Sequence, residues 1–325
     1  MSTCATASRE LDEPLAGTAA TARTWLLVEQ PGPWGAKALT SSHLDRALGA
    51  ALEAAAADTG VRIALIRRPG RHADCHSPAA RQVHAAHVRP TAGGTAPDAG
   101  TWLHSAVITD PARLSELDFA ALGRGDAASF DAELGGRVYT DEPLAFVCTN
   151  GKRDRCCALL GRPLAAELTA GGAGGTWEVT HLGGHRFSPT LLVLPYGYAY
   201  GRLDARAVRQ VLTAAHEGRI VTDGCRGSSA WDRPGQAAEL AVRRAVGEER
   251  AGVLSVVRSE PAEAGGPGAP PRRRVTVAHA DGRTWAVTVE QGAAQPPRPE
   301  SCGGALGTPA RMDVVALALQ APAGV

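Results

Sequence analysis

Short apolar runs and amphipathic stretches alternate along the first part of the chain. Apolar runs at residues 24–29, 61–66 and 102–108 predict buried strands. The Ala-rich stretch at residues 41–57 predicts a helix that begins with a capping serine. A strand followed by a helix-length crossover and a second strand is typical of a parallel α/β unit.

A second set of apolar runs begins near residue 144. Its predicted elements are strands at 144–147, 176–180, 188–197 and 198–202, with helices at 156–168 and 205–217. The last two strands pair as a hairpin. The resulting order is strand, helix, strand, strand, strand, helix, which is the minimal order of the thioredoxin fold.

The pattern changes after residue 221. Residues 231–246 predict an amphipathic helix with a proline near its start. Runs at 253–257, 274–279 and 284–290 predict strands, and Asp281-Gly282 predicts a tight turn between the last two.

These patterns predict an α/β protein with four segments. The segments are a disordered N-terminus (1–22), an N-terminal α/β domain that is possibly thioredoxin-like (23–140), a thioredoxin-like domain (141–222) and a small α+β appendage (223–325). The Pro-, Gly- and Arg-rich stretch at 261–273 predicts a mobile linker inside the appendage.

Charge and composition narrow the possible partners. The formal net charge of the 325 residues is +1, so no electrostatic footprint indicates binding to nucleic acid or to a membrane surface. Neither a secretory signal nor an apolar run of membrane-spanning length is evident, which predicts a cytoplasmic protein. In that reducing compartment the seven cysteines are expected to be thiols, metal ligands or redox groups.

Cysteines and histidines gather at the ends of two predicted strands. Cys148 ends one strand, and Cys156 and Cys157 begin the following helix, where the helix dipole favours thiolate. His181 and His185 follow the next strand and flank two glycines, which permit a sharp turn and a close backbone approach. Thiolates and imidazoles from neighbouring strand ends can meet at one metal centre.

The residue types alone leave three chemistries open. Two cysteines and two histidines can hold a structural zinc ion or a Rieske-like [2Fe–2S] cluster. The polar loop at 149–155 is longer than the spacing of a finger-type zinc site and favours the cluster. The third possibility is a thiol oxidoreductase with Cys148 or Cys156 as nucleophile, although no CxxC redox pair is present in this stretch.

These motifs resemble those of a known family. The sequence is similar to the sucrase/ferredoxin-like proteins, a branch of the thioredoxin-like [2Fe–2S] ferredoxins. The resemblance covers residues 24–245 and also takes in 274–303; its matching stretches are 29–35, 148–157, 181–190 and 195–197. Ser188-Pro189-Thr190 also resembles the thioredoxin segment in which a cis-proline opens a strand, so Pro189 is expected beside the Cys148 loop and His185.

The resemblance implies a cofactor and its ligands. It implies one [2Fe–2S] cluster held by Cys148, Cys157, His181 and His185, with Cys156 as the alternative to Cys157. It further implies a thioredoxin-like ferredoxin domain and an electron carrier, rather than a catalyst, that acts with redox partner proteins. Histidine ligation is expected to raise the reduction potential above that of all-cysteine ferredoxins.

Residues around this centre are expected to have supporting roles. Four are candidates for the surroundings of the cluster ligands: Arg153, Asp154, Arg186 and Pro189. Cys4, Cys225 and Cys302 lie in predicted loops or the tail and receive no role.

A second group of possible ligands lies in the first unit and comprises His72, Cys75, His76, His84 and His87. The favoured interpretation is a flexible, solvated loop that leads into the exposed face of a short helix at 79–87. The alternative is a second ligand group.

Overall fold

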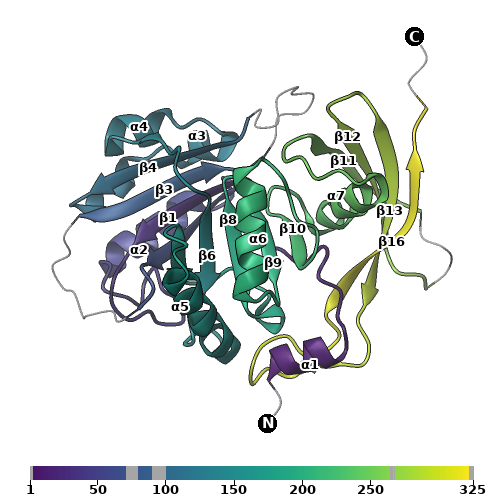
Figure 1. The fold of residues 1–325 in the computed structure, drawn as a ribbon, viewed down its shortest axis with the longest axis horizontal. Helices are drawn as coiled ribbons and strands as arrows, with labels where there is room; N and C mark the ends of the chain where they lie inside the picture. The colour runs from purple at the N-terminus through teal and green to yellow at the C-terminus, as the bar shows by residue number, and fades with distance from the viewer. Residues whose placement is uncertain (1–2, 71–79, 90–99, 264–265, 267, 322–325) are drawn as a thin grey trace.

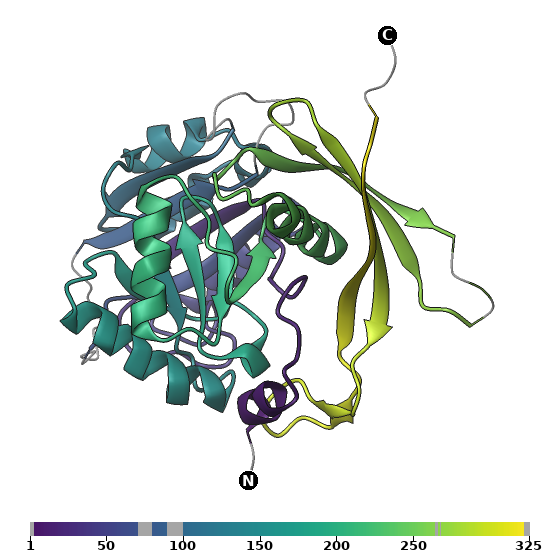
Figure 2. The same ribbon diagram turned by 45° about the vertical axis from the view of Figure 1, so that its right-hand side comes forward.

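A large and a smaller β-sheet lie on either side of one helix (Figures 1 and 2), and β14 and β15 form a separate two-stranded sheet. The computed structural model describes residues 3–70, 80–89, 100–263, 266 and 268–321. The larger sheet has ten strands in the order β10-β9-β8-β6-β7-β2-β1-β3-β4-β5, and the smaller has four in the order β11-β12-β13-β16. The predicted α/β class is confirmed.

The first half of the large sheet is formed by elements between residues 24 and 138, both strands and helices. Its strands are β1 (Thr24–Glu29), β2 (Val61–Arg67), β3 (Arg81–His87), β4 (Trp102–Ile108) and β5 (Arg137–Val138). Its helices are α2 (Arg46–Ala56), the 3₁₀ helix η1 (Pro111–Glu116), α3 (Phe119–Arg124) and α4 (Ala128–Leu134). β1 and β2 are parallel and joined through α2, whereas β3 and β4 run antiparallel to their neighbours.

The second half repeats this arrangement. Its strands are β6 (Leu144–Cys148), β7 (Thr176–Val179), β8 (Thr190–Leu194), β9 (Tyr198–Gly201) and β10 (Cys225–Ser228). Its helical segments are η2 (Cys157–Gly161), α5 (Arg162–Ala170), η3 (His185–Phe187) and α6 (Ala205–His216). β6 and β7 are parallel, and β8 and β9 follow antiparallel, so β7-β6-β8-β9 corresponds to β2-β1-β3-β4. The elements from β6 to α6 have the order that the sequence predicts.

The two halves join edge to edge within one sheet. β2 pairs antiparallel with β7, with Ile66 opposite Val179 and Arg67 opposite Glu178. Across this seam Arg67 Nε donates a hydrogen bond of 2.8 Å to Glu178 Oε2. Within the second half, Thr149 Oγ1 donates one of 2.9 Å to the same oxygen. The units that the sequence separates at residue 140 therefore share a continuous hydrogen-bonded sheet.

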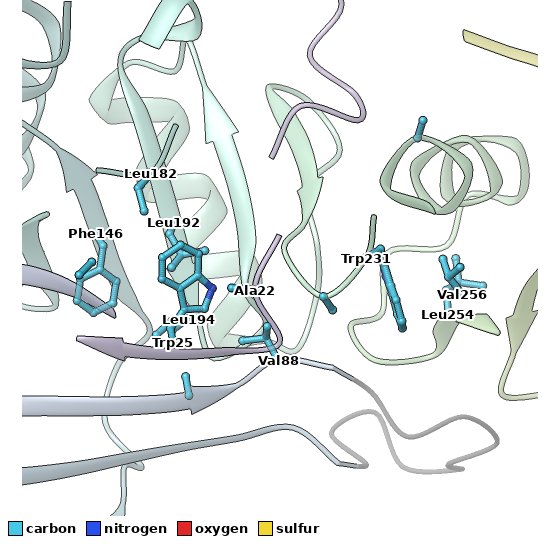
Figure 3. Close-up of a cluster of buried hydrophobic side chains, with 14 of the residues drawn as sticks. Ala22, Trp25, Val88, Phe146, Leu182, Leu192, Leu194, Trp231, Leu254 and Val256 are labelled. Atoms are coloured by element: carbon cyan, nitrogen blue, oxygen red, sulfur yellow. The ribbon is translucent and has the colours of Figure 1, made fainter. Parts of the chain in front are cut away.

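The C-terminal segment packs a curved sheet against one helix. The elements are α7 (Arg233–Val246), β11 (Leu254–Ala262), β12 (Arg272–His279), β13 (Thr284–Ala293), β14 (Arg298–Pro299), β15 (Leu306–Gly307) and β16 (Ala310–Leu319). Figure 2 shows α7 between the two sheets. Apolar side chains from both sides belong to one core cluster, which includes Trp25, Phe146, Leu192, Trp231 and Leu254 (Figure 3). Burial of this shared surface holds the appendage against the large sheet.

The N-terminal residues are ordered, so the expectation of a disordered segment at 1–22 is wrong for residues 3 onward. Cys4–Glu10 forms α1, and Thr3 caps it by accepting a hydrogen bond of 3.1 Å from the Thr6 amide. Cys4 is buried. This segment gains its order from packing against distant parts of the chain, which local composition does not reveal.

The helix expected at 79–87 is also wrong. Arg81–His87 forms β3 in the interior of the sheet, and both histidines are buried. Because they are three residues apart in a strand, they point to opposite faces. His84 packs against aromatic rings including Trp177, while His87 Nδ1 lies 2.8 Å from Thr24 Oγ1, so they do not form one ligand pair. His72, Cys75 and His76 lie outside the described residues.

Two further boundaries differ from the sequence prediction. The predicted linker at 261–273 begins and ends in strand, because Pro261 pairs with Arg273 and Ala262 with Arg272. The helix predicted from residue 41 begins at Arg46, where Asp45 rather than a serine accepts a 2.8 Å hydrogen bond from the Leu48 amide. Among the described residues, no helix has both the length and the apolar character needed to cross a membrane.

Candidate metal centre

Two adjacent parallel strands carry the predicted ligands to one edge of the sheet. Cys148 is the last residue of β6 and lies opposite Val179, the last residue of β7. His181 follows β7 by two residues. Parallel strands end on the same side, so the cysteine loop and the histidine loop begin next to each other.

The side chains of both loops converge. Cys157 Sγ lies 3.3 Å from His185 Nδ1, and the His181 and His185 rings stack with centroids 4.8 Å apart. Cys148 Sγ is 3.8 Å from the Thr180 carbonyl oxygen at the start of the histidine loop. The cysteine and histidine loops are therefore in contact through Cys157 and His185, with His181 against His185 and Cys148 at the start of the histidine loop.

The pKa values of the Cys148 and Cys157 thiols shift in opposite directions. Hydrogen bonding by Cys157 lowers the pKa of Cys148 well below its usual value, outweighing burial, and His181 lowers it further. The same interaction raises the pKa of Cys157, with burial acting in the same direction. Burial lowers the pKa of His185, and the nearby His181 lowers it further. A thiolate at Cys148 beside imidazole nitrogens is a suitable donor set for a metal.

The histidine loop has a buried ring nitrogen without a hydrogen bond among the described residues, and there is open space at Gly183. Nδ1 of His181 is buried and makes no hydrogen bond within the described structure. A Cβ placed on Gly183 would meet nothing within 4 Å, so this side of the loop is open. A buried nitrogen that lacks a partner, next to thiols and open space, fits the donor set of a metal group.

Two arginines, the half-buried Arg62 and the buried Arg226, fix the backbone of the histidine loop. Arg62 Nη2 donates a 3.1 Å hydrogen bond to the His181 carbonyl, and Arg226 Nη1 donates one of 3.0 Å to the Gly183 carbonyl. Gly183 and Gly184 have φ values of 77° and 70°, which side chains rarely adopt. At Gly184 a Cβ would also lie 2.1 Å from Arg226 Nη2, so the loop and the arginine fit only with glycine there.

The side chains of Cys156 and Cys157 face two different regions. Cys157 Sγ faces His185, whereas Cys156 Sγ lies 3.4 Å from Cys4 Sγ and 3.2 Å from Cys302 Sγ. The helical turn Cys157–Gly161 packs directly on the end of β6, because a Cβ on Gly161 would lie 2.1 Å from the Cys148 carbonyl oxygen. This close approach carries Cys157 toward the histidine loop.

The expected supporting residues have different surroundings. Arg153 is exposed, whereas Asp154 is buried and accepts hydrogen bonds from the Cys156 and Cys302 amides. Arg186 is buried and pairs with carboxylates from both ends of the chain, as described below. The Ser188–Pro189 peptide bond is cis, and Ser188 Oγ lies 3.9 Å from Cys157 Sγ, so this segment borders the cysteine loop as expected.

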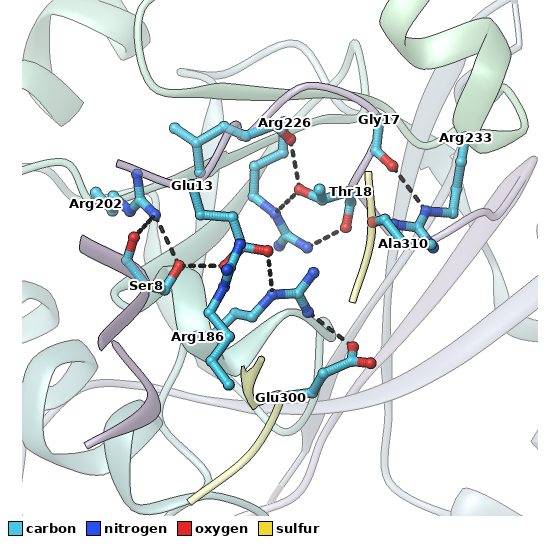
Figure 4. A network of polar contacts seen from close by, with 12 residues as sticks. Ser8, Glu13, Gly17, Thr18, Arg186, Arg202, Arg226, Arg233, Glu300 and Ala310 are labelled. Carbon is cyan, nitrogen blue, oxygen red and sulfur yellow. Dashed lines mark hydrogen bonds and ion pairs between the residues drawn. The ribbon is translucent and has the colours of Figure 1, made fainter. Parts of the chain in front are cut away.

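A network of arginines and carboxylates ties the N-terminal segment to Arg186, the residue after His185 (Figure 4). Arg186 Nε lies 2.9 Å from Glu13 Oε1, and its Nη1 lies 3.0 Å from Glu300 Oε2. Arg298 Nε donates to the other Glu13 oxygen at 3.0 Å. The chain ends thus meet beside the residue that follows His185.

Sequence reasoning missed Cys4 and Cys302. With Cys156 and Asp154 they form a group whose ligand atoms all lie within 4.8 Å of one another. Cys4 and Cys302 are 298 positions apart, so no local spacing links them. Cys225 is buried in β10, and burial raises its pKa to about 12, which fits a structural thiol.

The family model described as sucrase/ferredoxin-like matches residues 15–227. That range contains both loops of the candidate centre but neither Cys4 nor Cys302. Neither the curated proteins nor the solved structures yielded a match to the chain.

Proposed function

Because the chain belongs to the sucrase/ferredoxin-like family, we propose that it is a cytoplasmic electron carrier with one [2Fe–2S] cluster. The proposed ligands are Cys148, Cys157, His181 and His185. When bound, such a cluster supplies a one-electron redox couple.

The observation that carries this proposal is the pairing of donors by type. Cys157 lowers the pKa of the Cys148 thiol, and the His181 and His185 rings stack with their centroids 4.8 Å apart. In Rieske-type centres two histidines replace two cysteines on one of the two irons. A thiol pair beside an imidazole pair fits that arrangement.

The surrounding residues suit an electron-transfer site. Cys148 and Cys157 are about 1% exposed, so water is excluded on the cysteine side. His181 and His185 are only half-buried, which makes the histidine loop the natural side for contact with a redox partner protein. The nearby guanidinium groups of Arg62 and Arg226 favour the reduced, more negative state of the site.

Cys157 is proposed as the ligand in place of Cys156 because the side chains of these two neighbours face different groups. Cys156 Sγ faces the group with Cys4 and Cys302, whereas Cys157 Sγ is 3.3 Å from His185 Nδ1. Cys156→Ser and Cys157→Ser are therefore matched variants of neighbouring buried thiols with opposite expectations. Cys157→Ser should lower iron and acid-labile sulfide at least tenfold, and Cys156→Ser should retain them.

The decisive experiment is a visible spectrum of protein purified without oxygen, with iron and sulfide analysis and an EPR spectrum after reduction. Two irons and two sulfides per chain, with a red-brown colour and a signal on reduction, are expected for a [2Fe–2S] protein. A colourless protein with zinc at Cys148 and Cys157 would instead identify a structural zinc site. Thiol-dependent redox activity without any metal would identify a thiol oxidoreductase.

A further inference from the structure

Three cysteines from distant parts of the chain meet beside the proposed cluster loop. Cys4 lies in α1, Cys156 precedes η2, and Cys302 lies between β14 and β15. Their sulfur atoms are separated by 3.4 Å (Cys4–Cys156), 3.6 Å (Cys4–Cys302) and 3.2 Å (Cys156–Cys302). The three sulfurs thus form a nearly equilateral triangle.

These spacings suit one cation. Zinc binds thiolate sulfur at about 2.3 Å, so the sulfurs of a tetrahedral site lie about 3.8 Å apart. A disulfide needs two sulfurs at about 2.0 Å, and a single disulfide would leave one of the three thiols unpaired. The observed triangle favours no pair and is slightly smaller than the tetrahedral spacing.

A buried carboxylate completes the group. Asp154 is 4% exposed, and both of its oxygens lie 3.9 Å from Cys4 Sγ. Oδ1 accepts a 2.8 Å hydrogen bond from the Cys156 amide, and Oδ2 accepts one of 2.8 Å from the Cys302 amide. The carboxylate therefore orients two of the cysteines while its remaining lone pairs face the sulfur triangle.

We propose that Cys4, Cys156, Cys302 and Asp154 bind one zinc ion in a closed, tetrahedral structural site. Three sulfur donors and one oxygen donor, of which all but the half-buried Cys302 are buried, match the ligands that zinc accepts. Cys4 and Cys302 lie outside the family match at residues 15–227, and none of the four residues is among the proposed cluster ligands.

The site would fasten both ends of the chain to the cysteine loop. α1, the 149–155 loop and the β14–β15 loop have no covalent link to one another except through long stretches of chain. One bound cation would join all three and cover the outer side of the loop that carries Cys157. Metal binding would thereby stabilise this arrangement, since the unfolded chain has no preformed site.

The test compares two metals in matched cysteine variants of the full chain. Zinc and iron are measured by mass spectrometry in the wild type and in C156S, C302S, C157S and C225S. The wild type should hold one zinc per chain, C156S and C302S should lose at least nine tenths of it, and C225S should keep it. C157S should keep zinc while it loses iron, so the two proposals can fail separately.

Cobalt replacement gives a second readout on the wild-type protein. Cobalt(II) in a tetrahedral thiolate site produces intense visible absorption and sulfur-to-metal charge-transfer bands, and zinc should displace it. Such bands that disappear in C302S would support the site even where C156S fails to fold. Zinc that is absent from the wild type or unchanged in C302S, or a disulfide among the three cysteines in protein prepared without oxygen, would overturn the proposal.

Discussion

Cys156 and Cys157 are consecutive residues whose sulfur atoms belong to different groups. Cys156 Sγ lies 3.2 Å from Cys302 Sγ, and Cys157 Sγ lies 3.3 Å from His185 Nδ1. Neighbouring side chains at a helix start point about 100° apart around the helix axis, so they readily face different regions. One short segment thereby contributes to both of the proposed metal sites.

Replacing His185 with cysteine should lower the reduction potential of the proposed cluster. A thiolate adds negative charge where the imidazole is neutral, which favours the oxidised state, and the shift should be on the order of 100 mV or more. Redox titration followed by visible absorption measures it. His185→Ala, which supplies no ligand, is the matched control and should lose the colour. An unchanged potential in His185→Cys would argue against this histidine as a ligand.

The two glycines of the histidine loop should differ in their tolerance of alanine. Both have left-handed φ values, which cost a non-glycine residue about 1–2 kcal/mol. Gly183→Ala should lower the free energy of unfolding by about that amount, because its Cβ enters open space. Gly184→Ala should cost more, since its Cβ would collide with Arg226. Urea unfolding of both variants checks the order, and equal losses would contradict it.

Glu13 should contribute far more stability than Glu300, although both pair with Arg186. Glu13 is 4% exposed, and removing one partner of a buried ion pair costs about 3–5 kcal/mol. The Glu300 side chain is 62% exposed, and such pairs contribute about 0–1 kcal/mol. Chemical unfolding of Glu13→Gln and Glu300→Gln compares them. Proteolysis within the first residues should also become faster in Glu13→Gln only.

Acid should destabilise the fold partly through the buried His84. Burial lowers its pKa from 6.5 to about 4, with a smaller effect from the nearby Arg68. Between these values the unfolded chain binds a proton that the folded chain does not, so the free energy of unfolding decreases as the pH falls from 6.5 to 4. The loss from His84 reaches about 3 kcal/mol.

His84→Gln removes this titration, so its stability should fall less steeply than that of the wild type over the same pH range. The exposed His216 on α6 provides the matched control, and His216→Gln should leave the pH dependence unchanged. Urea unfolding at several pH values gives the curves. Parallel curves for the wild type and His84→Gln would show that the His84 side chain is not the cause.

Local patterns of apolar and polar residues predicted the elements in which the same pattern decides which side is buried. The apolar runs at β1, β2 and β6 to β8, and the amphipathic stretches at α6 and α7, lie where the sequence places them. β3 was missed because its polar residues recur every third position, as in a helix, while its place between β1 and β4 buries both faces. The short strand Cys225–Ser228 was not predicted, because it contains no apolar run. Its Arg226 is buried and makes hydrogen bonds there.

The two candidate metal sites also differ in how far the local sequence indicates them. Strand ends predicted that the cysteine and histidine loops would begin next to each other, because neighbouring parallel strands end on the same side of a sheet. The role of Cys148, His181 and His185 as ligands stays a prediction. The triangle of Cys4, Cys156 and Cys302 depends on how both chain ends pack, and sequence separations of 146 to 298 residues carry no such information. Contacts of this kind become visible only in three dimensions.

The seam between β2 and β7 would have a consequence for the proposed exchange of electrons. Glu178 accepts hydrogen bonds from Arg67 in the first unit and from Thr149 in the cysteine loop, so the loop is braced by the half of the sheet that contributes none of its ligands. An electron carrier works fastest when its surroundings need little rearrangement as the charge changes. In the proposed carrier the first unit would act as a brace: Arg67 holds the cysteine loop through Glu178, and Arg62 holds the histidine loop through the His181 carbonyl, although this unit supplies none of the proposed ligands.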